Sequence, residues 1–528
     1  MKRVSLLVIF LLCAFFMQAQ FFQVTEGPLF PAPEKGVVRL LQMKNGSTAY
    51  IHVDTDSGVH VQVYEPEYRV RTEARFIPSL LKQNNAVVEA IFEMNADVVL
   101  MISETGDDES NLYRVIIDGK TAKLKEEQRI ARAKINVPVK GKEKAADPVL
   151  PVFSVRYDSK GSGYAVAIIN KFISDTSKRV EIIMYTNDNR ESFRQHYSTK
   201  KEKYMYLQLV DMAVTGANKA AAVIYGYDQG KAGEKNGEVM LVTIEKDKPA
   251  LTVNELSYSN DLVPEFGILR YESTFNQLLM LTTARVRSDA ARPRNYLGYI
   301  NLSSRELVSN TVITAGDKLK AGYAELYGKK AEYKALPQDI LLNDDRSYTV
   351  IFEEQELYTG KEGGNYTAIR NTSVVNYDPE GVVNDAYLIP LEHTVQYFNP
   401  APFCQSGYKL RGQQFISNNQ YATVKFISDG HYSYLLLNDK EINAGAISGK
   451  PVSAMADLKG TNAFFCRLSG KELTPPREFV FGKPLPGTEP KLALFSVSDY
   501  DRANNLLVLL KQDKEDNRAG VKIVWLQP

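Results

Sequence analysis

"YDRANNLLVLLKQ" (residues 500–512), "YESTFNQLLMLTT" (271–283) and "YDSKGSGYAVAII" (157–169) share one layout: a Tyr, an acidic or amide-rich turn stretch and an apolar run. Their first residues lie 114 and 229 positions apart, close to two and four times 57. The stretch MAVTGANKAAAVIY at 212–225 fills the intermediate position between the copies that begin at Tyr157 and Tyr271, with Asn218 where Asn276 stands. A unit of about 40–70 residues therefore recurs along the chain, which is the mark of a repeat architecture.

Each unit has the same internal order of segments. A first strand leads through a tight turn, rich in Asn, Asp, Gly or Ser, into a strongly apolar second strand. A polar loop and a third strand follow, and a more charged fourth segment ends the unit. Examples are the loops at 106–111, 285–295 and 512–520, the third strands at 112–117 and 520–526, and the fourth segment at 120–130. Radial sheets require this order, because neighbouring sheets cover the inner strands while the outer strand meets water.

The repeat predicts an all-β fold: a β-propeller of about eight four-stranded blades, with seven as second choice and β-sandwich domains as the alternative. Turn anchors lie near Gly46, Ala96, Ser162, Asn218, Asn276, Arg346, Asn419, Asn462 and Asn505. Asn419, Asn462 and Asn505 are 43 residues apart, so we interpret them as the same turn, with an apolar strand at 420–426. Nine anchors exceed the usual range, and the hairpin around Asn462 lacks a clear fourth strand. We therefore interpret that hairpin as an insertion.

The two ends of the chain complement each other. The last unit stops after its third strand, and the stretch FFQVTE at 21–26 has the composition of the missing outer strand. Pairing of the two would close the ring and leave no open sheet edge. The stretches around 79–83 and 319–332 are the best helical candidates, and 139–151 and 481–490 are interpreted as crossings between blades.

The first residues have the layout of a secretory signal peptide. Lys2 and Arg3 precede an apolar run of thirteen residues from Val4 to Phe16, which is shorter than the roughly 18 residues of a membrane-spanning helix. We expect cleavage after Ala19, which makes residues 1–19 the signal peptide and 20–528 a single propeller domain, secreted or periplasmic. An uncleaved anchor is the alternative, and no later segment is long enough to span a membrane.

Charge and cysteine content exclude some partners and leave others open. Without Lys2 and Arg3 the chain has one more acidic than basic residue, so it offers no long-range attraction to nucleic acid or anionic lipid. We expect a monomer. Cys404 and Cys466 are the remaining cysteines; the sequence leaves their pairing open, although two lone cysteines are more often small buried side chains.

Motif searches predict no catalytic residue, no cofactor and no metal site. No G-x-S-x-G nucleophile motif occurs, and GAISGKP at 445–451 does not fit a phosphate loop. A four-residue turn at 55–58 would place the imidazoles of His52 and His60 on opposite faces of their hairpin. The stretch DTDSG at 54–58 supplies fewer oxygens than the roughly six to eight that calcium takes.

Two further groups of residues are weighed as ligand sites. The first is an arginine cluster on a predicted loop, which we interpret as a solvated loop tip: Arg285, Arg287, Arg292 and Arg294. The second is a set of strand tyrosines, which we interpret as packing residues with hydroxyls at the rim: Tyr225, Tyr227, Tyr296 and Tyr299.

In its signal peptide and repeat the chain resembles secreted bacterial β-propeller proteins, over nearly all of its mature length. It matches no propeller family with a known active site. The resemblance implies an exported ring with a central channel and loop-built faces.

Two hypotheses about function follow. The absence of catalytic motifs favours a non-enzymatic binding or scaffold protein that engages a protein or glycan partner in the cell envelope. The alternative is a glycan hydrolase or lyase with carboxylates at the channel mouth. It gains support if acidic and aromatic side chains of several blades meet in one pocket with raised carboxylate pKa values.

Overall fold

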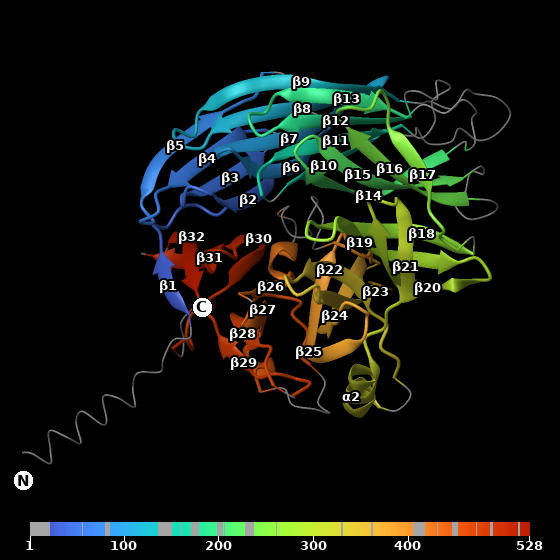
Figure 1. Ribbon diagram of the computed structural model, residues 1–528. Coiled ribbons are helices and arrows are strands. Elements are labelled where there is room, and N and C mark those ends of the chain that lie inside the picture. The colour runs from blue at the N-terminus through green and yellow to red at the C-terminus, as the bar shows by residue number, and fades with distance from the viewer. Residues whose placement is uncertain are drawn as a thin grey trace, which may run out of the picture.

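The computed structural model describes residues 22–528 except 55, 80–84, 136–149, 159, 171–178, 198–203, 205, 228–236, 260, 329–330, 361–362, 405–414, 416–417, 430, 446–451, 471, 486–488 and 516–517. At 290–292 it describes the backbone alone. Within these residues 32 strands form eight four-stranded antiparallel sheets that follow one another around a ring (Figure 1). The predicted eight-bladed β-propeller is confirmed.

Each of the first four blades is a meander whose strands pair in chain order. Blade 1 comprises β2 (Val37–Gln42), β3 (Thr48–Asp54), β4 (Gly58–Tyr64) and β5 (Val70–Phe76). Blade 2 comprises β6 (Ala86–Met94), β7 (Asp97–Thr105), β8 (Glu109–Asp118) and β9 (Leu124–Lys134). Blade 3 comprises β10 (Val152–Tyr157), β11 (Gly163–Ile169), β12 (Val180–Thr186) and β13 (Glu191–His196). Blade 4 comprises β14 (Tyr206–Gly216), β15 (Lys219–Tyr227), β16 (Gly237–Glu245) and β17 (Thr252–Glu255).

The next three blades repeat the meander, and the last blade is built from both ends of the chain. Blade 5 comprises β18 (Leu262–Glu272), β19 (Gln277–Val286), β20 (Asp289–Asn301) and β21 (Glu306–Val312). Blade 6 comprises β22 (Leu336–Leu342), β23 (Tyr348–Thr359), β24 (Asn365–Tyr377) and β25 (Val383–Gln396). Blade 7 comprises β26 (Lys425–Ser428), β27 (Ser433–Lys440), β28 (Thr461–Arg467) and β29 (Arg477–Phe479). Blade 8 comprises β30 (Ala493–Asp501), β31 (Leu506–Glu515), β32 (Arg518–Gln527) and β1 (Gln23–Glu26).

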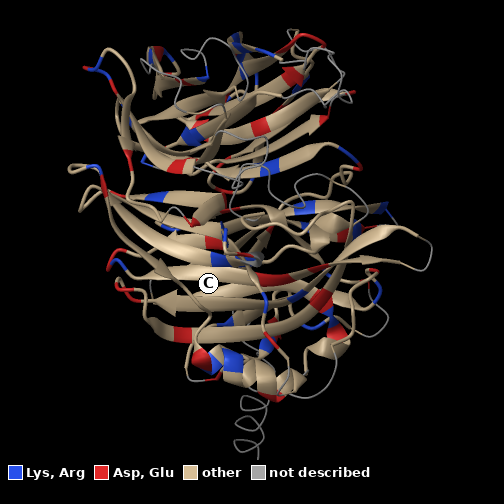
Figure 2. Cartoon of the chain, turned by 90° about the vertical axis from the view of Figure 1, so that its right-hand side faces the viewer, with Lys and Arg blue, Asp and Glu red and all other residues tan. Residues whose placement is uncertain are grey.

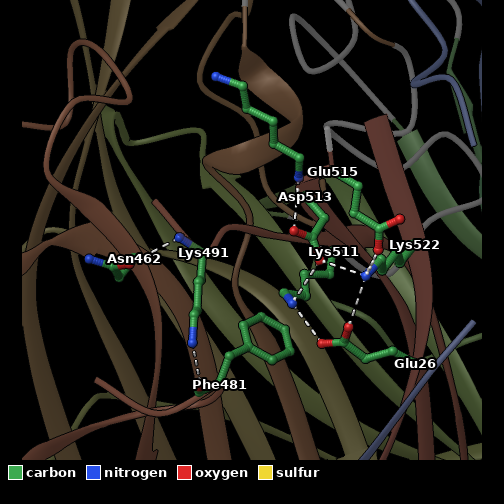
Figure 3. A network of polar contacts seen from close by, with 9 residues as sticks. Glu26, Asn462, Phe481, Lys491, Lys511, Asp513, Glu515 and Lys522 are labelled. Atoms are coloured by element: carbon green, nitrogen blue, oxygen red, sulfur yellow. Dashed lines mark hydrogen bonds and ion pairs between the residues drawn. The ribbon is translucent and has the colours of Figure 1, made fainter. Parts of the chain in front are cut away.

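The N-terminal strand closes the ring, as the sequence predicts. β1 pairs antiparallel with β32, with Val24 opposite Leu526 and Glu26 opposite Val524, and in Figure 1 the blue β1 lies beside the red β32. Around Glu26 a network of charges holds this edge (Figure 3): its carboxylate accepts hydrogen bonds from Lys511 at 2.6 Å and Lys522 at 3.4 Å. The outermost strand of blade 8 is therefore fastened by backbone pairing and by ion pairs.

Apolar side chains fill the space between neighbouring blades, and their placement follows the predicted order within the unit. All seven residues of the second strand β11 are buried, whereas the fourth strand β5 alternates between exposed and half-buried residues. A large apolar cluster joins blades 6, 7, 8 and 1 and includes Trp525, which is 1% exposed. Burial between sheets rather than within one central core thus stabilises the ring.

The Tyr and acidic residue that begin each repeated stretch lie at the turn between the first two strands of a blade. In blade 8 the Tyr500 hydroxyl donates to Oδ1 of Asn505 at 2.8 Å, and Asn505 has a positive φ of 48°. The Asp501 carboxylate accepts two backbone N–H groups of the same turn, at 2.9 and 3.2 Å. Tyr271 and Asn276 repeat the contact in blade 5 at 3.2 Å. The repeated phrase is therefore turn chemistry, since Asn tolerates the left-handed conformation and Asp mimics a backbone turn.

The interpretation of blade 7 was wrong in its details. Asn419 lies in a short 3-10 helix, Asn419–Tyr421, and Asn462 lies inside the third strand β28; neither has a positive φ. The blade's first turn joins Ser428 to Ser433, so the stretch 420–426 mostly precedes the innermost strand instead of forming an apolar second strand. The hairpin around Asn462 is part of a complete blade, and the eight blades need no insertion.

Two predicted polar loops are largely strand. β19 and β20 continue to Val286 and from Asp289 within 285–295, and β31 and β32 continue to Glu515 and from Arg518 within 512–520. Polar residues can extend a hairpin beyond the core because its far end meets water on both faces.

The helical candidate at 319–332 corresponds to α2 (Asp317–Tyr327), whereas most of the candidate at 79–83 falls outside the described residues. The crossings at 139–151 and 481–490 lie between blades 2 and 3 and between blades 7 and 8; most of the first and residues 486–488 of the second are not described. Short 3-10 turns are Asn419–Tyr421 and Glu441–Asn443.

Basic and acidic residues are interspersed on the side of the ring that Figure 2 shows, along strands as well as loops. None of the helices in the described part of the chain is long and apolar enough to cross a bilayer. Cys404 is half-buried and Cys466 is buried, and the two form no disulfide with each other.

Candidate functional site

A cavity of about 680 Å³ lies where the innermost strands of all eight blades meet. The strands β2, β6, β10, β14, β18, β22, β26 and β30 each contribute to its wall. Asp158, Lys160 and Ser273, from the turns that join first and second strands, line its mouth. The cavity therefore lies in the central channel and extends to the face that carries these turns.

Charged side chains alternate in sign around this channel. The cations Arg39, Arg156, Arg270 and Lys425, of blades 1, 3, 5 and 7, and the carboxylate Asp339 of blade 6 line the cavity. Asp211 of blade 4 and Asp499 of blade 8 lie on neighbouring innermost strands, where they interact with Arg156 and Arg39. Blade 2 contributes apolar Val88 and Ile91 instead. Four cations against three carboxylates leave this set with one surplus positive charge.

Two of the carboxylates are firmly held by arginines of the preceding blade. Arg156 donates from Nε to Oδ1 of Asp211 at 2.8 Å, and Oδ2 of Asp211 accepts the backbone N–H of Leu269 in blade 5 at 2.8 Å. Arg270 donates from Nη2 to Oδ1 of Asp339 at 2.9 Å. These charge-assisted bonds join neighbouring blades and neutralise both acids.

Local backbone irregularities position these acids. The pairing of β14 with β15 shifts between Leu209 and Asp211, and that of β22 with β23 shifts between Pro337 and Asp339. A bulge of one residue changes which face of the strand the following side chain takes. Pro337 is tolerated because the innermost strand has one edge without a strand partner.

The third carboxylate, Asp499, is bound differently. Its Oδ2 accepts the backbone N–H of Gln42 in blade 1 at 2.8 Å, while Nη2 of Arg39 stays 3.9 Å from Oδ1. Asp499 therefore joins blade 8 to blade 1 chiefly through a backbone hydrogen bond, and its contact with Arg39 is longer than a hydrogen bond.

Tyr157 adds an aromatic group to the channel. Its ring stacks on Phe92 of blade 2, with centroids 4.8 Å apart and planes 7° from parallel. It keeps 37% of its surface accessible although it lies among the channel charges. Burial raises the pKa of the Tyr157 phenol, and the nearby Arg39 and Arg270 oppose that rise.

Burial also shifts two of the charged channel residues. It raises the pKa of the Asp339 carboxyl above its usual range, against the opposing effect of Arg270. It lowers the pKa of the Lys425 ammonium, an effect that Arg39 strengthens and Asp499 opposes. Acidic and aromatic side chains of several blades thus meet in one pocket, with one raised carboxylate pKa, which is the arrangement set out above as favouring an enzyme.

The sequence-based candidates lie elsewhere. His52 and His60 are direct cross-strand partners, so the prediction that their imidazoles lie on opposite faces was wrong. Asp54 pairs with Gly58, which makes the turn one residue shorter than the predicted one. His60 Nε2 contacts Glu73 at 2.8 Å, and His52 Nε2 contacts the backbone oxygen of Lys35 at 2.8 Å. Asp54 accepts the hydroxyl of Ser57 within its turn at 2.6 Å. Across the residues with described placement, no three His, Cys, Asp or Glu side chains gather as a metal site.

The arginine cluster is only partly a solvated loop tip. Arg285 lies in β19 and, like Arg287 just after that strand, is half-buried, and Arg287 donates to the Tyr225 hydroxyl at 3.2 Å. Arg285 pairs with Glu265 at 2.9 Å and Arg294 with Asp289 at 3.8 Å, on the β19–β20 hairpin. The side chain of Arg292 is outside the described set. The Tyr225 ring is 1% exposed and stacks on that of Tyr227, with centroids 5.5 Å apart, so these tyrosines are packing residues.

Comparisons with known proteins identify no family: no family model and no curated protein matches the chain. Among solved structures, a prolyl endopeptidase has a TM-score of 0.34 at 10% identity, covering 76% of this chain and 54% of its own, so this chain spans about half its length. Polysaccharide lyase Uly1 has a TM-score of 0.36 at 10% identity, covering 83% and 89%. The endosialidase of phage phi92 has a TM-score of 0.33 at 8% identity, covering 89% and 72%. Similarity at this level identifies no ligand or reaction for the channel.

Proposed function

We propose that the protein is an exported, non-enzymatic binding propeller that engages a glycan through its central channel. The observation that carries the proposal is the charged cavity of about 680 Å³ to which every blade contributes. Pockets for small ligands usually measure about 300–1,000 Å³ and contain a few well-placed polar groups. A glycan end, polar on all sides, suits a wall of arginines, carboxylates and one accessible tyrosine.

A protein partner fits this cavity less well than a glycan. A stable protein interface buries roughly 800 Å² on each partner, over a broad surface. The cavity measures about 680 Å³, and most of its polar groups come from the innermost strands. We therefore favour a glycan over a folded protein as the channel ligand.

The alternative function is a glycan hydrolase or lyase. It is supported by Tyr157, Asp339 and Lys425 in one cavity, with the raised carboxyl pKa of Asp339 and the lowered ammonium pKa of Lys425. Against it, Arg156 and Arg270 bind the carboxylates of Asp211 and Asp339 through charge-assisted hydrogen bonds, which leaves both poorly placed to exchange a proton with a substrate. Binding without turnover is the better supported function.

Calorimetric titration of residues 20–528 with neutral and acidic oligosaccharides tests the proposal, combined with chromatography of the sugars after incubation. Ile91→Trp would fill the apolar wall of the channel, and Val308→Trp, on the outer strand β21 where Val308 is 63% exposed, is the matched control. We expect sugar binding that Ile91→Trp abolishes and Val308→Trp preserves, with no product. Product formation that Asp339→Asn abolishes would establish the enzyme instead. If the protein binds envelope proteins but no sugar, and Ile91→Trp leaves that binding unchanged, the proposal of a glycan channel is refuted.

Export belongs to the same proposal and has its own test. The sequence predicts removal of residues 1–19, so the mass of the mature protein should correspond to a chain beginning at Gln20. Mass spectrometry of the protein from medium and cell fractions measures this directly. A full-length chain that stays in the cytoplasm would refute it.

A further inference from the structure

The four channel cations differ in how many acceptors the protein gives them. Arg156 donates to Asp211 and to the backbone oxygen of Val155, and Arg270 donates to Asp339 and to the backbone oxygens of Leu269 and Ile340. The donors of these two guanidinium groups are largely occupied by the protein. They serve mainly to hold neighbouring blades together.

Arg39 and Lys425 are left with unused donors. Within the described part of the chain, the side chain of Arg39 has one polar contact, to Asp499 at 3.9 Å, which is too long for a hydrogen bond. In the same part of the chain Lys425 forms no ion pair or side-chain hydrogen bond. Both residues line the cavity, on blades 1 and 7, on either side of blade 8.

An ammonium group that is mostly withdrawn from water is costly without an acceptor. The nearby carboxylates do not remove that cost. Asp339 is engaged by Arg270, and Asp499 is shared between Lys425, Arg39 and the backbone N–H of Gln42. Arg39, Lys425 and Asp499 together keep one positive charge. Burial lowers the pKa of the Lys425 ammonium, and the charges of Asp499 and Asp339 oppose this effect without cancelling it.

We propose that Arg39 and Lys425 form an oxyanion subsite in the channel, which binds a carboxylate or sulfate group of the ligand. The inference rests on the proposed glycan function and narrows it to acidic sugars. The planar guanidinium of Arg39 can give two parallel N–H donors to such a group, and Lys425 adds a point charge from the other side of blade 8. Tyr157, accessible from the cavity, is available to contact the sugar ring.

The test compares one sugar with and without its charge. A short oligogalacturonate, its fully methyl-esterified form, a sulfated galactan oligosaccharide and inorganic sulfate are titrated into wild type and Lys425→Met. Lys320→Met, on α2 and paired only with exposed Asp317, is the matched control for loss of one positive charge. We expect the wild type to bind an acidic sugar about tenfold or more tightly than the ester, and Lys425→Met to lose that preference. The oligogalacturonate and the galactan show whether carboxylate or sulfate is preferred.

Stability measurements separate a binding role from a structural one. Since Lys425 forms no side-chain hydrogen bond and no ion pair within the described chain, Lys425→Met should unfold at the same or a higher temperature than wild type. A destabilised Lys425→Met variant that binds acid and ester as wild type does would overturn the subsite and make Lys425 a structural residue. Equal binding of acid and ester by wild type would also overturn it, while leaving the glycan function intact.

The same experiment separates failure of the subsite from failure of the glycan function. If no sugar binds but sulfate raises the wild-type unfolding temperature and not that of Lys425→Met, the subsite stands and the glycan function fails. If neither sugars nor sulfate bind, both are overturned. Arg39→Gln provides a second variant with the same expected loss of charge preference.

Discussion

Trp525 makes closure of the ring measurable, because it is the single tryptophan of the chain and lies at the seam between blades 8 and 1. Its indole Nε1 donates to Oγ1 of Thr48 in blade 1 at 2.9 Å, and its ring contacts those of Tyr64 and Tyr68 at 5.5 and 4.6 Å. The Thr48 hydroxyl in turn donates to Oε1 of Gln42 at 2.9 Å. Thr48→Val should therefore remove the hydrogen bonds of the Thr48 hydroxyl to Trp525 and Gln42 while keeping the shape of the side chain.

The expected cost follows from burial. Trp525 and Thr48 are each 1% exposed, so the indole N–H would be left buried without an acceptor. Such a group costs about 1–3 kcal/mol, and the half-buried Gln42 adds less, giving about 2–4 kcal/mol for Thr48→Val. Thr48→Ser keeps the hydroxyl and loses one methyl group, at about 1 kcal/mol. Valine should thus be the worse substitution by about 1–3 kcal/mol, although it is the larger apolar residue.

Urea unfolding followed by Trp525 fluorescence measures the free energy of unfolding at the contact between blades 8 and 1. In a Trp525→Phe background, followed by circular dichroism, the excess cost of Thr48→Val over Thr48→Ser should shrink by about 1 kcal/mol or more, since no buried indole N–H remains. Equal stability of the valine and serine variants in the wild-type background would refute the reasoning.

Three further substitutions test other contacts. Lys511→Met should lower the free energy of unfolding by about 1–2 kcal/mol, because Glu26 loses its ion pair with the buried Lys511 ammonium. Lys514→Met removes an exposed ion pair and should change it by less than about 0.5 kcal/mol. Equal effects of the two substitutions in urea titration would contradict this. Asp501→Ala should cost about 1 kcal/mol through loss of two turn hydrogen bonds, and an unchanged urea midpoint would argue against a role in the turn. Burial raises the pKa of Glu354 in the folded state, so stability should fall as pH rises from the unfolded toward the folded pKa; thermal unfolding of Glu354→Gln should lack that fall.

The fold was predictable because the same turn-forming residues recur in several blades. Asn276 and Asn505 adopt positive φ at equivalent turns, and the acidic residue after each Tyr binds the turn backbone. Blade 7 was misread because spacing between asparagines is a weaker signal than the turn itself. Asn462 repeats the distance of 43 residues but lies within a strand, where its Oδ1 accepts the backbone N–H of Lys491 at 3.0 Å.

The channel site carried a signal that the motif searches did not use. Three charged residues on the innermost strands stand directly before the Tyr and acidic residue of the repeat: Arg156 and Arg270, which line the cavity, and Asp499, which lies beside Arg39. Most of the other charged channel residues also stand alone in an apolar first strand, a few residues before its turn. What the sequence could not supply is the pairing between blades, because Arg156 and Asp211 are 55 residues apart and meet only once the blades are arranged around a ring.

The proposed oxyanion subsite and the closure of the ring involve the same blades. Arg39 and Lys425 flank blade 8 at the channel, while β1 and Glu26 fasten that blade at its outer edge. A ligand held by both cations would contact blades 7 and 1 together, and would bind the closed ring better than an opened one. Binding at about 100 times the dissociation constant would then add roughly 2.7 kcal/mol to the stability of the closed form. Anion binding should therefore add about the same free energy to wild type and to variants whose outer fastening is weakened, such as Lys511→Met, and so offset part of their loss of stability.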